Sequence, residues 1–324
     1  MTHLYPFAFR PIFKERIWGG RSLQTLYGKV LPPGVRVGES WEISDRPGDE
    51  SLIDNGPLAG RALGSVLREF PAELLGPGKE TPGRFPLLIK ILDAEEKLSL
   101  QVHPPAALAA KLGGEPKTEM WYVAHAGPKA ELFVGLKKGV TRADFERKLA
   151  DQTVADCFHR VRVHAGDAMF LQSGRVHALG AQTVIFEIQQ NSDTTYRVFD
   201  WNRVDAGGKS RELHIAQSLA SIDFNDFEPP LLPADFRPGN PGRLRPLVSC
   251  ELFQVNLRQL EPGDSLSLPD GRMTILGLVE GGALLSWPSA NLSLAAGQFC
   301  LVPAACASVS VRAESAATIL EVTR

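Results

Sequence analysis

The sequence predicts a mainly β protein, a sandwich or barrel with a few covering helices. Its 324 residues include 30 glycines and 24 prolines, and this density of chain breakers leaves only short apolar segments. Many of these segments are β-branched or aromatic and lie between turn residues, which is typical of short strands in an all-β fold. The expected strands are 87–92, 169–171, 183–188, 253–257, 273–278 and 318–322.

Charge and composition exclude several classes of protein. The chain has 35 Lys and Arg against 37 Asp and Glu, a net charge of −2, so we expect neither a nucleic acid nor an anionic membrane as partner. The N-terminal segment lacks a signal-peptide pattern, and no apolar run approaches the roughly 20 residues of a spanning helix. The 4 cysteines are dispersed, which favours free thiols. We therefore expect a cytoplasmic protein.

Three segments are expected to form helices that cover the β core. The segment 106–112 follows two prolines and precedes a glycine, the usual order of helix start and stop signals. The segment 142–150 can be capped by Thr141 and has acidic residues in its first turn. The segment 211–222 would pack against the sheet through one apolar face, formed by Leu213, Ala216, Leu219 and Ala220.

A proline-rich segment divides the chain. Residues 227–245 show little periodicity, which indicates a linker or an extended crossover. After it, the segment 247–324 contains several strand-like runs and no convincing helix. We therefore expect two domains, a larger one over 1–235 and a small C-terminal β domain over 245–324.

The segment 97–104 is expected to be a strand with one polar face. Alternation places Ser99, Gln101 and His103 on that face and aliphatic residues on the other. A β-barrel builds a ligand site in this way, with the apolar face toward the core and the polar face toward a cavity. Prolines follow His103, so this histidine is expected at a strand end. Alone, a histidine at a strand end is more often a hydrogen-bonded surface residue.

A second expected strand, 117–123, aligns Lys117, Glu119 and Trp121 on one face. A carboxylate buried beside a cation and an aromatic ring requires a partner such as a metal ion. The alternative is that Lys117 and Glu119 lie at the solvent-facing end of an amphipathic strand.

Two later segments complete the candidate site. His177 lies in a turn framed by glycines, which can hold its ring in a cavity. Beyond the strand that carries Glu187, a polar turn leads to Arg197 and Arg203, whose guanidinium groups match phosphate oxygens. We expect Arg197 to project from a loop, where functional side chains often lie. Arg203 could instead form a salt bridge with Asp200.

Together these residues form a mixed nitrogen and oxygen ligand set. Two histidines, a glutamate and a glutamine on separate strands suit Zn²⁺ or a related divalent ion. Such a set leaves room for a substrate oxygen, as in catalytic rather than structural sites. The four candidate ligands in this set are Gln101, His103, Glu119 and His177.

Several segments resemble the type I phosphomannose isomerases, in the order in which that family has them. Those segments are PLLIKILDA, KLSLQVHP, KTEMWYV, SGRVHALG and EIQQNSDTTYRVFDW. An early IWGG and GESWEIS resemble the short bacterial form of the family, and the chain length agrees. The resemblance extends from Trp18 to Arg203 and so covers more than half of the chain.

The resemblance implies a zinc-dependent aldose–ketose isomerase with a cupin-like (jelly-roll) catalytic domain over 1–235 and a small cupin-like domain over 245–324. It would convert mannose 6-phosphate and fructose 6-phosphate through an enediolate, as a monomer or weak homo-oligomer with a sugar phosphate as its partner. The family motifs imply Gln101, His103, Glu119 and His177 as metal ligands, Arg197 as the active-site arginine, and Ser99, Lys117, Glu187 and Arg203 as substrate-binding residues.

Two other functions remain open from the residues. An Fe(II) cupin oxygenase could use two histidines and one carboxylate, although Gln101 would fill a position that oxygen needs. A non-catalytic cupin that binds sugar phosphates would keep the pocket without turnover, since a fold alone does not decide function. Within the isomerase hypothesis, the proton could be transferred by Glu187, Lys117 or a metal-bound water.

Overall fold

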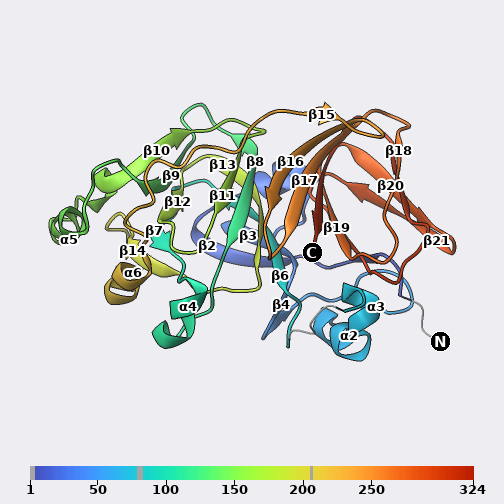
Figure 1. Ribbon diagram of the computed structural model, residues 1–324, viewed down its shortest axis with the longest axis horizontal. Helices are drawn as coiled ribbons and strands as arrows, with labels where there is room; N and C mark the ends of the chain where they lie inside the picture. The colour runs from blue at the N-terminus through green and yellow to red at the C-terminus, as the bar shows by residue number, and fades with distance from the viewer. Residues whose placement is uncertain (1–3, 79–82, 205–206) are drawn as a thin grey trace.

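Four antiparallel sheets lie in layers across the molecule, and a two-stranded ribbon lies beside them (Figure 1). The structure is a computed structural model and describes residues 4–78, 83–204 and 207–324. The mainly β architecture predicted from the short strand-like segments is confirmed.

Two of the sheets come from the N-terminal two thirds of the chain. The six-stranded sheet has the order β11-β8-β13-β6-β2-β3, and the five-stranded sheet has the order β10-β9-β12-β7-β14. The strands of the six-stranded sheet are β2 (Ile12–Gly20), β3 (Val37–Ile43), β6 (Leu87–Ala94), β8 (Glu119–Ala126), β11 (Ala168–Leu171) and β13 (Thr183–Gln190). Those of the five-stranded sheet are β7 (Leu100–Val102), β9 (Glu131–Leu136), β10 (Phe158–Arg162), β12 (His177–Leu179) and β14 (Tyr196–Phe199).

The other two sheets come mostly from the C-terminal part, drawn in orange and red in Figure 1. The seven-stranded sheet consists of β1 (Phe7–Ala8), β15 (Arg237–Pro238), β16 (Arg243–Ser249), β17 (Gln254–Leu260), β19 (Thr274–Glu280), β22 (Phe299–Val302) and β24 (Ala317–Thr323). The four-stranded sheet consists of β18 (Ser265–Ser267), β20 (Gly282–Trp287), β21 (Ala290–Ala295) and β23 (Ser310–Ala313). The ribbon pairs β4 (Asp45–Arg46) with β5 (Asp49–Glu50).

Short helices cover the outer faces and the ends of the sheets. They are α1 (Ser22–Tyr27), α2 (Leu63–Glu69), α3 (Pro71–Leu75), α4 (Ala106–Ala109), α5 (Arg142–Ala150) and α6 (Ile215–Ser221), with 3₁₀ turns η1 (Ala110–Leu112) and η2 (Val154–Cys157). The expected cap of α5 is present, because Thr141 Oγ1 accepts a hydrogen bond from Asp144 N at 3.1 Å. In the part of the chain that the structure describes, no helix has the length and apolarity needed to cross a membrane.

Strand alternation separates the apolar cores from the polar face that forms the candidate site. On β13, Phe186 and Ile188 point into the core shared with the seven-stranded sheet. Ile185 points to the opposite side, where it packs in a second core between the six- and five-stranded sheets. Glu187 and Gln189 follow on that same side by the two-residue period of a strand. The space between these two sheets therefore receives every second side chain of β13.

The helix expected over 211–222 is shorter than predicted and buries a different face. His214 is bound to β14, since Arg197 N donates to His214 Nδ1 and His214 N donates to Arg197 O. The helix therefore begins only after His214, and it packs on β14 and β7 through Ser218 and Ser221. The predicted apolar face was wrong, because three of its four residues are exposed: Leu213, Ala216 and Ala220.

The proline-rich segment 227–245 is an extended crossover between the two pairs of sheets. Arg245 at its end is buried and donates to the backbone carbonyls of Gly166, Leu232 and Pro233. The strand β1, from the start of the chain, pairs with β22 of the C-terminal sheet. The two halves also share an apolar core. The division into domains over 1–235 and 245–324 stays a prediction.

Candidate active site

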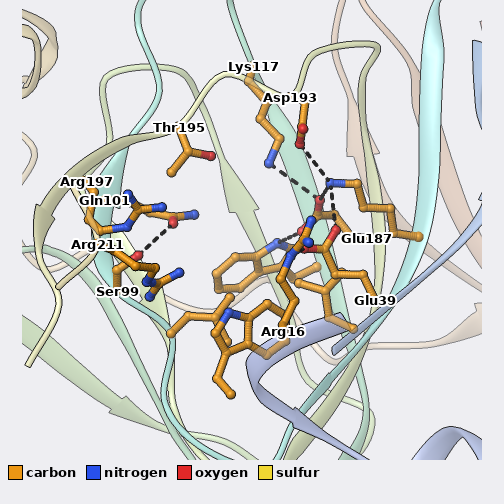
Figure 2. A pocket seen from close by; sticks show the side chains of 15 residues that line it. Arg16, Glu39, Ser99, Gln101, Lys117, Glu187, Asp193, Thr195, Arg197 and Arg211 are labelled. Carbon is orange, nitrogen blue, oxygen red and sulfur yellow. Dashed lines mark hydrogen bonds and ion pairs between the residues drawn. The ribbon is translucent and has the colours of Figure 1, made fainter. Parts of the chain in front are cut away.

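A cavity of about 400 Å³ opens between the six- and five-stranded sheets (Figure 2). Its lining is mostly polar and charged. In Figure 2, one side carries Ser99, Gln101, Thr195, Arg197 and Arg211, and the other carries Arg16, Glu39 and Glu187, with Lys117 and Asp193 above. The remaining lining residues are Trp18, Lys90, Leu92, Leu98 and Trp121.

His103, Glu119 and His177 meet beside this cavity, in contact with its lining residues Gln101 and Lys117. Their ligand atoms all lie within 4.8 Å of one another, and the three residues are at most 1% exposed. Glu119 Oε1 lies 3.3 Å from His177 Nε2, and Glu119 Oε2 lies 3.6 Å from His103 Nε2. Two ligand atoms about 2.1 Å from a tetrahedral ion lie about 3.4 Å apart, so these separations fit one small divalent ion.

Both imidazole rings are oriented by backbone carbonyls. His103 Nδ1 lies 2.8 Å from the Thr194 carbonyl, and His177 Nδ1 lies 3.0 Å from the Arg175 carbonyl. A carbonyl can only accept, so each Nδ1 carries the proton and each Nε2 offers a lone pair. Burial, helped for His103 by the nearby Lys117 ammonium, lowers the pKa of His103 to about 3 and also lowers the pKa of His177. The rings are therefore neutral, as metal ligands must be.

Gln101 supplies a fourth polar group to the cluster. β7 and β12 pair directly at Gln101 and His177, and Gln101 Nε2 lies 3.3 Å from His177 Nε2. Its Oε1 is 3.4 Å from Ser99 Oγ. A half-turn of the amide plane exchanges these two atoms and turns the oxygen toward the histidine. Gln101 therefore fits a ligand position that an oxygen atom would fill.

Lys117 already places a positive charge beside two of the candidate ligands. Its Nζ lies 2.6 Å from Glu119 Oε2 and 3.4 Å from His103 Nε2. Burial would raise the pKa of Glu119, but the adjacent Lys117 ammonium holds this pKa well below its usual range. Neither carboxylate oxygen of Glu119 accepts a hydrogen bond of good geometry from the described residues. Glu119 is thus a buried carboxylate paired with the Lys117 ammonium, and the solvent-exposed alternative for these two residues is wrong.

A second charge network forms the opposite wall. Lys90 Nζ lies 3.5 Å from Glu39 Oε2 and 3.6 Å from Glu187 Oε1. Trp121 Nε1 donates to Glu187 Oε2 at 3.0 Å. Burial raises the pKa of Glu187 despite its proximity to Lys117 and Lys90. Burial would lower the pKa of Lys117, but the carboxylates of Glu119 and Glu187 raise it.

The chain matches known proteins over most of its length. Residues 7–115 match the family model described as phosphomannose isomerase type I, catalytic domain. The probable mannose-6-phosphate isomerase GmuF of Bacillus subtilis (strain 168) is 38% identical over 287 residues, which cover 87% of each chain. The chain belongs to the type I phosphomannose isomerase family.

Other members of the family agree with this assignment. The mannose-6-phosphate isomerase ManA of the same strain is 40% identical over 220 residues, or 67% of this chain and 68% of ManA. A crystal structure of the mannose 6-phosphate isomerase from Bacillus subtilis superposes with a TM-score of 0.89 and 29% identity, over 98% of this chain and 99% of that chain. The cupin-like fold predicted from the sequence resemblance is confirmed.

The structure brings most of the predicted site residues of this family member together. Ser99, Gln101, Lys117, Glu187 and Arg197 line the cavity. The three residues predicted as metal ligands beside Gln101 contact the lining residues Gln101 and Lys117: His103, Glu119 and His177.

Arg197 lies on a strand and not on the predicted loop. β14 pairs with β7 so that Arg197 is opposite Gln101, and Gln101 is in turn opposite His177 on β12. Its Nη1 donates to the Glu212 carbonyl at 2.7 Å, and its Nε is buried without a hydrogen-bond partner among the described residues. The strand pairing thus directs an incompletely satisfied guanidinium group toward the cavity.

Arg203 lies away from the cavity. Its guanidinium group donates to Asp200 Oδ1 at 2.5 Å and to the Lys97 carbonyl at 2.7 Å. Two consecutive residues with positive φ, Trp201 and Asn202, form a tight turn that folds Arg203 back onto Asp200. The salt bridge to Asp200, left open by the sequence, is present, and substrate contact by Arg203 stays a prediction.

Sequence reasoning missed five charged residues of the cavity: Arg16, Glu39, Lys90, Asp193 and Arg211. Arg211 shares Asp200 with Arg203, donating from Nε at 2.7 Å and from Nη2 at 2.5 Å. It stands fourteen residues after Arg197 in the chain, so sequence spacing did not place it near Arg197. For the other wall, the usable signal was a charged residue inside a strand segment: Glu39 on β3 and Lys90 on β6.

Glu39 should give the protein an acid-dependent stability. Burial would raise its pKa, but Lys90, Arg16 and the Trp41 indole lower this pKa to about 2 from 4.5. A carboxyl group with a depressed folded-state pKa stabilises the fold above its unfolded-state pKa, and this contribution is lost as the pH falls toward the folded-state value. The ionised group then contributes about 3 kcal/mol, so Glu39→Gln should be less stable than wild type at pH 6, with the difference shrinking between about pH 4.5 and 2.

Urea unfolding at pH 6, 4 and 3 measures this difference directly. Glu15→Gln, in an exposed position on the neighbouring strand, is the control and should follow the wild type at each pH. A deficit for Glu39→Gln that does not change with pH would contradict the assignment.

Proposed function

We propose that the protein is a metal-dependent isomerase that interconverts mannose 6-phosphate and fructose 6-phosphate. The observation that carries the proposal is the pair of neutral imidazoles whose Nε2 lone pairs converge on the buried carboxylate of Glu119. Family membership supports the reaction, since the matched relatives bear the name mannose-6-phosphate isomerase. The proposal includes a sugar phosphate as partner, a cytoplasmic location, and a monomer or weak homo-oligomer.

The proposed metal ligands are His103, Glu119, His177 and Gln101, and the proposed ion is Zn²⁺, one per chain. Three nitrogen or carboxylate ligands with one amide oxygen suit this ion, and the preset Nδ1 hydrogen bonds hold both rings in the ligating tautomer. When bound, such an ion acts as a Lewis acid for the oxygens of the reacting carbons.

Glu187 is the best candidate for the base that transfers the proton between C1 and C2 of the sugar. Its carboxylate is 2% exposed, lines the cavity and has a raised pKa, which are properties of a general base that must also return the proton. Lys117 is less suited because Glu119 and Glu187 raise its pKa and keep it protonated. Lys117 would instead hold the positive charge that balances the two carboxylates.

The phosphate group is best placed at the opposite end of the cavity. Arg211 lines that end together with the hydroxyl groups of Ser99 and Thr195 (Figure 2). Arg211 uses Nε and Nη2 for Asp200, and its remaining nitrogen can meet an anion. Arg203 would act on the substrate through Asp200, which it shares with Arg211.

The two alternatives have less support. An Fe(II) oxygenase needs an open position for oxygen, yet Gln101 lies beside His177 within the cluster. A non-catalytic binding protein has no use for a buried, cavity-lining carboxylate such as Glu187 held between two lysines. The cations of the cavity and the family membership both favour the isomerase.

Removal of either histidine should remove the metal and the activity together. His103→Ala and His177→Ala are each expected to lower metal affinity by 10-fold or more, since loss of a ligand should cost at least as much as loss of its hydrogen-bond partner. Metal content after dialysis, and fructose 6-phosphate formed from mannose 6-phosphate in a coupled assay, measure both effects. His164→Ala, at an exposed position, is the control. Full metal retention in both variants would refute the ligand assignment.

Arg197 should act on turnover more than on folding. The pairing of Arg197 with Gln101 places its guanidinium group near the reacting carbons, where it can hold charge that exists only in the enediolate. Arg197→Lys keeps the charge but loses the planar fork, so kcat should fall by about 100-fold or more, with near wild-type metal content and Tm. A raised KM with unchanged kcat would make Arg197 a uniform phosphate ligand instead.

Arg211 and Arg203 should differ although both bind Asp200. Arg211→Met is expected to raise KM for mannose 6-phosphate by about 10- to 100-fold with kcat nearly unchanged, because a hydrogen bond to a charged group contributes about 1.5–3 kcal/mol. Arg203→Met is the matched control and should change KM by only a few-fold. Inhibition by inorganic phosphate measures the same difference without turnover. Equal losses in the two variants would contradict direct contact by Arg211.

A further inference from the structure

A buried glutamine at the end of β13 donates hydrogen bonds to the loop that orients His103. Gln189 is fully buried and lies opposite Glu119 in the pairing of β13 with β8, two residues beyond Glu187. Its Nε2 donates to the Gln190 carbonyl at 2.8 Å and to the Ser192 carbonyl at 2.6 Å. Both amide protons are therefore used to hold the first turn of the loop that follows the strand.

The orientation of this amide is fixed by its surroundings. Two carbonyl oxygens face the nitrogen, and a flipped amide would place its own oxygen against them. Gln189 Oε1, in turn, is buried without a hydrogen-bond partner among the described residues. An unsatisfied buried acceptor is destabilising, so the two donated hydrogen bonds are held at the expense of stability.

The loop held by Gln189 connects directly to the metal cluster. Ser192 Oγ accepts from Thr194 N at 3.2 Å, and Thr194 Oγ1 accepts from Glu115 N at 2.9 Å. These contacts fix the Thr194 carbonyl, which lies 2.8 Å from His103 Nδ1. The path from Gln189 to the ring of His103 thus consists of one buried side chain and five loop residues.

We infer that Gln189 is a positioning residue, which holds His103 in its metal-binding tautomer through the loop 190–194. This inference rests on the proposed metal site. Without the clamp, the Thr194 carbonyl can withdraw from the ring, and the Nδ1 proton loses its acceptor. The imidazole is then free to rotate or to take the other tautomer, which removes the Nε2 lone pair from the cluster.

Gln189→Met tests the clamp, since it removes both donors and the unsatisfied oxygen without adding charge. We expect the dissociation constant for Zn²⁺, from competition with a chelator, to rise by about 10- to 100-fold. In the metal-free variant, ¹⁵N NMR should show His103 leaving the single Nδ1–H form of the wild type. Thr183→Val is the matched control, because it removes a buried donor to the Gly180 carbonyl at the other end of the same strand. It should leave both readouts unchanged.

The outcomes separate this inference from the proposed function. Wild-type Zn²⁺ affinity and an unchanged His103 tautomer in Gln189→Met would overturn the positioning role. A wild-type protein that binds no Zn²⁺ at this cluster would overturn the proposed function, and the tautomer measurement would still decide on the clamp. If Gln189→Met does not fold, Gln189→Asn keeps an amide too short to reach both carbonyls and should move both readouts in the same direction by less.

Discussion

The buried carboxylate of Glu119 is the constraint on which the site depends. It is 0% exposed, and an ionised group in such a position costs several kcal/mol unless cations and hydrogen bonds balance it. Lys117 at 2.6 Å supplies one positive charge. The lone pairs of His103 and His177 point at the same space and cannot supply another, because both rings are neutral. A divalent cation at the centre would give the two lone pairs and the Glu119 carboxylate a common partner.

Strand geometry explains how separate segments reach this centre. The side chains come from β7, β8, β12 and β13 or from residues at their ends, and period-two alternation turns each toward the space between the same two sheets. The opposite faces of these strands are apolar and fill the two neighbouring cores. One set of alternating residues therefore stabilises the fold, and the other set forms the site.

Much of this could be predicted from the sequence. Alternation in 97–104 and 117–123 predicted the polar faces of these strands. The order of the family motifs predicted that His177 and Glu187 belong to the same site. The sequence could not show where Arg203 points, because that depends on two left-handed residues in a row. It also could not show that Arg211 returns to the cavity, since this follows from the pairing of residue 214 with β14. The contacts of Arg203 and Arg211 depend on the three-dimensional path of the chain, which periodicity does not predict.

The central claim is that one divalent ion is held where these strands converge. The most direct measurement is anomalous diffraction at the zinc edge from crystals of the metal-loaded protein. The account predicts one peak per chain, bonded to His103 Nε2, His177 Nε2 and a Glu119 oxygen at about 2.0–2.2 Å. A peak at another position, or an active protein whose crystals show none at this cluster, would contradict it.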